Sequence, residues 1–216
     1  KYYADDTSIY HTNNIFLHLL NILLVYWLVI LISKGSIIAA SIASTLFAFH
    51  PMNVETVAWI STRSNLLFAA FTLLSIICHI KYITNDKRKI LYSLSFLSLI
   101  LALLSKSQAI VIPPILVLFD FYYKRKITKK VIFEKLPFFV LAIAFGLITF
   151  YTRKPASDNI EWNIEGIFDK LLYVCYAIPW YFLKLIAPFN LCAVHYYHDK
   201  VNNFLPVIFY ITPIVL

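Results

Sequence analysis

The chain has 216 residues, of which 61% are hydrophobic and only 14% are charged, with three glycines and a formal net charge of +8. A soluble domain carries roughly 45–50% apolar and about 25% charged residues, so this composition excludes an ordinary soluble globular protein. We expect an all-α, polytopic helical membrane protein with about seven to eight transmembrane or half-membrane helices.

Long apolar runs occur along the whole chain. Their lengths approach the ~20 residues that a helix needs to cross ~30 Å of hydrocarbon, and a backbone that faces lipid must satisfy its own hydrogen bonds. With no repeat or linker visible, residues 1–216 are expected to form one membrane-embedded domain. The expected spans are approximately 15–33, 36–49, 64–80, 90–104, 109–123, 136–151, 171–188 and 204–216.

The first span carries a stripe of four polar residues at spacings of three, four and three: His11, Asn14, His18 and Asn21. At about 100° per residue they share one narrow helix face. The stripe could form hydrogen bonds between helices or line a wet cavity. The two histidines lie too far apart to bind one metal unaided, and no divalent metal site is predicted.

The segment "FHPMNVETVAWISTRSNLL" interrupts the apolar sequence. Pro51 ends the preceding helix and suits the first turn of a new one. In a continuous helix, Glu55, Trp59 and Arg63 would follow at i, i+4 and i+8 on one face. They could form an interfacial helix anchored by Trp59, with a weak ion-pair network. Alternatively, they could form a charged outer vestibule that positions a substrate.

Two loops carry most of the positive charge. Loop 81–91 has four basic residues and one acidic residue, a net +3, and loop 120–135 has six basic and two acidic residues, a net +4. By the positive-inside rule both loops are cytoplasmic. Such clusters indicate topology and contact with anionic lipids rather than a nucleic-acid partner. The segments then expected outside are the N-terminus, 50–63, 105–108 and 152–170.

The stretch "LLSKSQAIVIPP" lies between apolar runs of 15 residues (90–104) and 11 residues (109–119). At ~1.5 Å per residue, neither run comfortably crosses ~30 Å. The hairpin is therefore expected to turn short of the outer surface, with Lys106 on the floor of an outward-facing, water-filled cavity. A lipid phosphate is the expected anion there. The alternative is that Lys106 extends to the headgroups.

Four segments, taken together, resemble one family. "FHPMNVETVAWISTRSNLL" resembles its His-Pro-x-x-x-Glu-x-Val-Ala…Arg-x-x-Leu-Leu signature, and "YHTNNIFLHLLN" its first helix after the leading outer loop. "LLSKSQAIVIPPILVLFDFYY" resembles its Ser-Lys-x-Gln hairpin and following Asp, and "YFLKLIAPFNLCAVHYY" the segment that closes its membrane region. The family is the transmembrane and tetratricopeptide-repeat proteins, in the C-type glycosyltransferase superfamily related to protein O-mannosyltransferases.

The resemblance implies an integral membrane glycosyltransferase of a bacterial or archaeal plasma membrane or of the ER membrane. It would move a sugar, with mannose as one candidate, from a polyprenyl- or dolichyl-phosphate donor to an acceptor protein Ser or Thr on the outer or lumenal face. The residues expected to contact donor or substrate are His50, Glu55, Arg63, Lys106 and Gln108. The catalytic acids are expected in a first outer loop upstream, and none is assigned here.

Two other functions remain open at this point. A transporter or flippase of an anionic or lipid-linked substrate would also need a polar cavity, although the inverted repeats typical of transporters are not visible. A noncatalytic membrane scaffold would act through tetratricopeptide repeats. We expect the sequence to be a fragment that lacks its first helix, its first outer loop and any such repeats.

Overall fold

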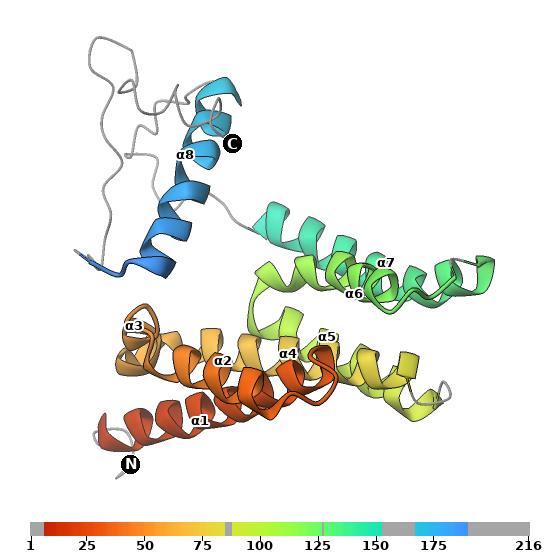
Figure 1. Cartoon of the computed structure of the whole chain (residues 1–216). Coiled ribbons are helices and arrows are strands. Elements are labelled where there is room, and N and C mark those ends of the chain that lie inside the picture. Colours follow the sequence, from red (N-terminus) through yellow and green to blue (C-terminus); the bar gives the residue numbers. More distant parts are fainter. Residues whose placement is uncertain (1–6, 85–87, 127, 153–166, 190–216) are drawn as a thin grey trace, which may run out of the picture. The chain divides into compact units, whose positions relative to one another are not determined.

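The computed structural model describes residues 7–84, 88–126, 128–152 and 167–189, and every regular element in these ranges is a helix (Figure 1). The expected all-α class is therefore confirmed for the described part of the chain. Contacts divide the chain into two compact units, residues 1–154 and 155–216. The elements are α1 (Thr7–Ile32), α2 (Ile37–Phe49), α3 (Asn53–Ala58), the 3-10 helix η1 (Ile60–Thr62), α4 (Arg63–Thr84), α5 (Lys89–Ser105), the 3-10 helix η2 (Ser107–Val111), α6 (Ile112–Tyr122), α7 (Lys129–Thr152) and α8 (Ile167–Ile186).

Seven of the eight expected spans coincide with these helices, and the eighth, 204–216, lies outside the described residues. Within the described ranges, three helices are long and apolar enough to cross a membrane: Ser8–Ile32, Arg63–Thr84 and Lys129–Thr152. Shorter apolar helices cover 37–49, 89–105, 107–122 and 174–186. Run length thus located the helices well, because each apolar run was bounded by polar or helix-breaking residues.

The outward faces of these helices are apolar. Phe16 on α1 is 68% exposed and Phe150 on α7 is 78% exposed, and many other large apolar side chains are exposed on the same helices. A soluble monomer rarely shows contiguous apolar patches of this extent. These faces are consistent with contact to lipid.

A tight turn joins α1 to α2. Gly35 has φ +98°, a left-handed value that disfavours residues with a Cβ atom. Its N–H donates to the Ile30 carbonyl over 2.9 Å, which closes the end of α1. The Ser36 hydroxyl then accepts the N–H of Ala39 at 3.3 Å and caps α2.

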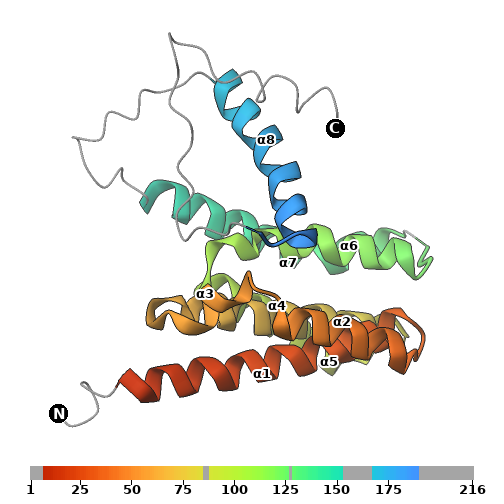
Figure 2. The same cartoon turned by 60° about the vertical axis from the view of Figure 1, so that its left-hand side comes forward.

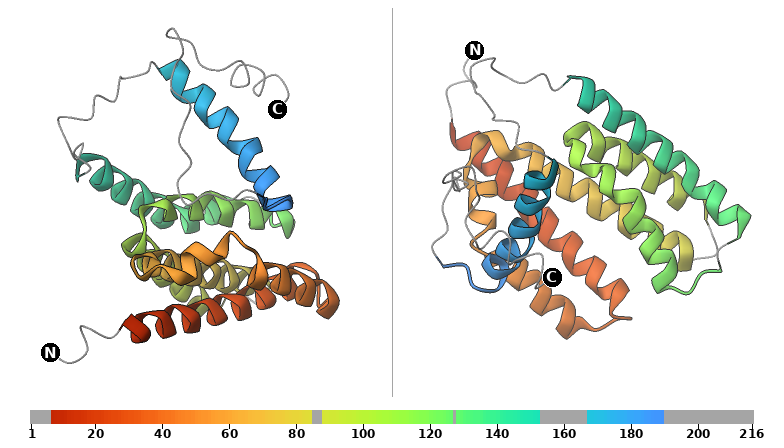
Figure 3. Two further views of the ribbon diagram at one scale, coloured as in Figure 1. Left: turned by 90° about the vertical axis from the view of Figure 1, so that its left-hand side faces the viewer. Right: turned by 90° about the horizontal axis from the view of Figure 1, so that it is seen from above.

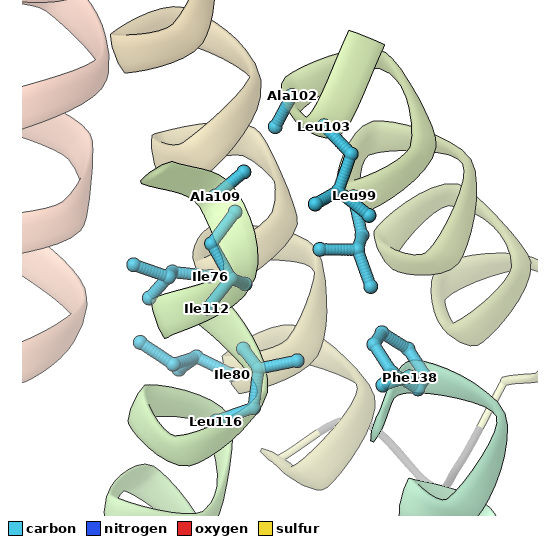
Figure 4. Packing of buried hydrophobic residues seen from close by; sticks show 9 residues of the cluster. All are labelled: Ile76, Ile80, Leu99, Ala102, Leu103, Ala109, Ile112, Leu116 and Phe138. Atoms are coloured by element: carbon cyan, nitrogen blue, oxygen red, sulfur yellow. The ribbon is translucent and has the colours of Figure 1, made fainter. Parts of the chain in front are cut away.

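The core of residues 1–154 lies where α4 and α5 pack against η2, α6 and α7 (Figure 4). Ser75 and Ser95 let α4 and α5 approach closely, because each hydroxyl donates to the other residue's carbonyl, over 2.9 and 2.8 Å. On the other side, α1 lies alongside α2 and α4 (Figures 2 and 3). The core residues are Ile76, Ile80, Leu99, Ala102, Leu103, Ala109, Ile112, Leu116 and Phe138.

The segment 120–135, counted above as a loop, is mostly helical in the structure. Helix α6 continues to Tyr122, as the expected span 109–123 predicted, but α7 begins at Lys129 instead of near residue 136, so only a short connection joins the two helices. Asp120 and Lys135, counted above as loop charges, are helical and only 3% and 5% exposed. Their side chains form an ion pair with Nζ–Oδ2 at 2.7 Å, which lets both ends be buried. Charge counting missed this because it treated every charged residue as solvated.

Candidate functional site

A polar pocket of about 260 Å³ opens where α1, α2, α3 and α4 meet the turn between α5 and η2. It joins two features that the sequence placed far apart, the first-span stripe and the Lys106 hairpin. We call it the outer pocket, after the side on which the sequence analysis expects the turn 105–108. It is lined by His18, Asn21, Phe47, Asn53, Thr56, Asn65, Leu66, Phe68, Ala69, Lys106 and Gln108.

Lys106 forms the tip of the hairpin, as the sequence predicted. Its backbone is extended, with φ −157° and ψ 133°, between the end of α5 and the start of η2. The ammonium is partly buried and donates to the amide oxygen of Asn65 over 2.6 Å. Among the described residues, no carboxylate lies within ion-pair distance of Lys106. A neutral amide orients this cation but does not compensate its charge, so the chemistry of the pocket is suited to an anion.

The polar stripe of α1 both forms hydrogen bonds to other helices and lines the pocket, the two alternatives that the sequence left open. The side-chain amide of Asn14, which is fully buried, donates to the carbonyls of Val57 at 3.3 Å and Trp59 at 3.0 Å. Asn21 is also fully buried; it donates to the Leu66 carbonyl at 3.0 Å and lines the outer pocket. The amide oxygens of both asparagines lack a hydrogen-bond partner within the described structure.

The two histidines of the stripe differ. His18 lines the outer pocket, and its Nε2 lies 3.3 Å from the Ala48 carbonyl. In the tautomer that carries a proton on Nε2, it donates to that oxygen and fixes α1 against α2. His11 is exposed near the start of α1 and does not line the pocket. Of the four residues of the stripe, His18 and Asn21 line the pocket, whereas His11 and Asn14 do not.

The expected shared face of Glu55, Trp59 and Arg63 is wrong. The helix breaks at Trp59, whose ψ of 130° is extended, so α3 ends before it and α4 begins at Arg63. The amide of Asn14 and the hydroxyl of Thr62 bond the carbonyls that the break frees; Thr62 donates to the Trp59 carbonyl over 2.7 Å. These side-chain bonds replace the intrahelical hydrogen bonds that are lost at Trp59, so the break does not leave those carbonyls unsatisfied.

The three residues of this segment that were expected to contact substrate do not line the outer pocket. His50 follows α2, and its Nδ1 accepts the N–H of Met52 at 3.2 Å. Glu55 is exposed. The guanidinium of Arg63 lies 5.2 Å from the ring centre of Tyr10, on α1. No Glu55–Arg63 ion pair is present among the described residues, so the expected network between them is absent.

Several pocket residues were missed by sequence reasoning. Asn65 is the most important, because it holds the Lys106 ammonium. Asn53 donates to the Phe47 carbonyl over 2.6 Å and shapes the pocket wall. The sequence showed Asn65 only as a polar residue near the start of an otherwise apolar helix. Such a residue does not reveal that its partner is Lys106, 41 positions away.

A second polar cluster, also missed, lies toward the opposite end of α5. Asp120 is bonded by Lys135, and its Oδ1 lies 3.4 Å from both His79 Nε2 and the Arg125 guanidinium. Arg125 also contacts the Glu134 carboxylate at 2.5 Å. Burial lowers the pKa of Arg125, but its bonds to Glu134 and Asp120 raise it, and the net shift of its pKa is upward. This buried charge cluster joins α4, α6 and α7, so it is suited to holding helices together.

Comparison with known proteins gives one informative similarity. The chain is 29% identical over 154 residues to a protein of Caenorhabditis elegans named protein O-mannosyl-transferase. The match covers 69% of this chain but 21% of the relative, so the chain spans about a fifth of that protein's length. No family model matches the chain, and no solved structure matches it. The similarity supports the coarser part of the expectation drawn from the motifs, a glycosyltransferase-like family.

Proposed function

We propose that the chain is part of a membrane glycosyltransferase that moves a sugar from a polyprenyl-phosphate donor to a protein Ser or Thr. Mannose is the sugar that the name of the Caenorhabditis elegans relative suggests. The outer pocket would bind the donor phosphate, and the acceptor would approach from the outer or lumenal face. Support comes from the similarity to that relative and from the chemistry of the pocket.

The observation that carries the proposal is the uncompensated Lys106 ammonium in the outer pocket. The partly buried Lys106 and the buried Lys135 differ in the groups that bond them. Lys135 is bonded to the carboxylate of Asp120, so its charge is balanced within the protein. Lys106 is bonded to the neutral amide of Asn65. A cation at membrane depth needs an anionic partner or water, and a lipid phosphate supplies the anion along with chains that can occupy the surrounding bilayer.

In the proposed reaction, the acceptor hydroxyl attacks the sugar carbon that bears the phosphate, and the lipid phosphate leaves. Lys106 would stabilise the charge that develops on the leaving phosphate. A general base would take the hydroxyl proton, and no described residue is assigned that role. Gln108 and His18 also line the pocket, where they could bond to phosphate or sugar oxygens. His50, Glu55 and Arg63 would act at the pocket mouth.

The position of the outer pocket agrees with the proposed topology. Helix α5 has 17 residues and would span about 25 Å at ~1.5 Å per residue. Lys106 follows its last residue, whereas the basic residues Arg88 and Lys89 lie at its start. If the basic end is cytoplasmic, the pocket opens on the other side, where the acceptor would be found.

The test uses the intact protein and measures both binding of a polyprenyl-phosphate sugar and sugar transfer. Lys106→Met should weaken donor binding by at least ten-fold and slow transfer, because it removes the charge and retains the apolar stem. Asn65→Asp should also weaken binding, because the new carboxylate would pair with Lys106 and compete with phosphate. Lys34→Met, at an exposed lysine in the α1–α2 turn, is the matched control. Donor binding by Lys106→Met as tight as that of wild type would overturn the proposed role.

A further inference from the structure

A second pocket lies at the end of α5 opposite the outer pocket. It has a volume of about 340 Å³, is open on one side, and is formed by the last turn of α4 and the first two turns of α5 and α7. We call it the basic pocket. It is lined by Tyr82, Lys89, Tyr92, Lys130, Phe133 and Glu134. The proposed transfer reaction uses none of these residues.

The aromatic wall of the basic pocket is held in place by bonds between helices. The hydroxyl of Tyr92 donates to the Glu134 carbonyl over 2.8 Å, which ties α5 to α7. The rings of Tyr82 and Tyr92 lie 5.6 Å apart, and the Arg125 guanidinium lies 5.6 Å from the Tyr82 ring centre. The Glu134 carboxylate contacts Arg125 at 2.5 Å, so its negative charge is already balanced. The pocket is thus preorganised and presents net positive charge.

The lysines of this pocket lie at helix N-termini, where acidic residues are usually favoured. Lys89 is the first residue of α5 and Lys130 the second of α7, where a cation opposes the helix macrodipole. Neither helix has an acidic residue in its first turn, and neither lysine forms an ion pair with a described residue. Arg88, which precedes α5, gives no side-chain cap to its free N–H groups. An anion between the two helix starts would compensate both the lysines and these N–H groups.

The surroundings of the pocket indicate an amphipathic ligand. Phe133 lines the pocket and is 70% exposed; Ile90, which follows Lys89, is 67% exposed, and Ile132, two positions after Lys130, is 58% exposed. A phosphate beside two lysines and hydrocarbon chains along these apolar side chains would match both chemistries. We propose that the basic pocket is a binding site for the headgroup of an anionic phospholipid, with an acyl chain packed against Phe133.

The proposal is tested by titrating the intact protein, purified in a neutral detergent, with phosphatidylglycerol or phosphatidylcholine. Bound lipid is counted by native mass spectrometry. A neutral detergent removes the general attraction of a charged membrane surface, so only a specific site remains. At roughly five-fold per lysine, Lys89→Gln with Lys130→Gln should weaken phosphatidylglycerol binding by about 25-fold. The matched control, Lys124→Gln with Lys126→Gln, removes the same charge from exposed residues of the α6–α7 connection.

Three outcomes would overturn the proposal. The first is equal retention of phosphatidylcholine and phosphatidylglycerol by wild type. The second is an equal loss of phosphatidylglycerol in the control variant, which would indicate general attraction instead of a site. The third is displacement of the lipid by glycerol phosphate at matched concentration, which would indicate a site for soluble phosphates. A further variant, Phe133→Ala, should weaken lipid binding while leaving the two lysines in place.

Discussion

The buried charge cluster permits a quantitative prediction about folding. Asp120 and Lys135 are almost completely buried, and their side chains meet at 2.7 Å. Removing one partner of such a pair leaves an uncompensated charge and typically costs about 3–5 kcal/mol. We expect Lys135→Met and Asp120→Asn to lower the free energy of unfolding by amounts within this range, but not by equal amounts.

The geometry decides which variant costs more. In Lys135→Met, the Asp120 carboxylate keeps its contacts to His79 and Arg125, each at 3.4 Å, so the loss should be about 3 kcal/mol. In Asp120→Asn, the Lys135 ammonium loses its paired carboxylate, and the other partners within hydrogen-bond distance, His79 and the Leu116 carbonyl at 3.5 Å, are neutral. That loss should approach about 5 kcal/mol.

The measurement is reversible unfolding of the intact protein in detergent micelles, followed by a probe on α4. Lys129→Met, at an exposed lysine on the same helix, is the control and should change the free energy of unfolding by less than about 0.5 kcal/mol. The double variant Asp120→Leu with Lys135→Met should be more stable than Asp120→Asn alone, because it leaves no buried charge unpaired. A loss below about 1 kcal/mol in both single variants would refute the reasoning.

Three other predictions concern topology and local structure. A cysteine placed at Thr128 should resist an impermeant thiol reagent in sealed vesicles of native orientation, whereas one at Asn159 should be labelled; the reverse pattern would contradict the topology. Asn14→Leu should lower the free energy of unfolding by about 1–3 kcal/mol, because it removes the side-chain donor to the Val57 carbonyl and one of the donors to the Trp59 carbonyl; an unchanged unfolding midpoint would contradict this. Gly35→Ala should cost about 1 kcal/mol by the same assay, because φ +98° disfavours a Cβ even where space is open.

Composition and run length were sufficient to locate the helices. A helix in lipid satisfies its own backbone, so an apolar run of suitable length marks a helix without knowledge of its neighbours. The hairpin at Lys106 was predicted on the same basis, because two short runs flanked a polar turn. The narrow stripe from His11 to Asn21 followed from helical periodicity. These features depend on residues within a few turns of one another.

The partners of the polar residues depended on tertiary structure. The break at Trp59 is stabilised by Asn14, 45 positions away, and a local pattern with no Pro or Gly at that point favoured a continuous helix. Lys106 and Lys135 look alike in sequence, yet one is bonded to an amide and the other to a carboxylate. Only the packing of α4 against α5, α6 and α7 decides which groups meet. That packing determines which lysine has a carboxylate as its partner and which has a neutral amide.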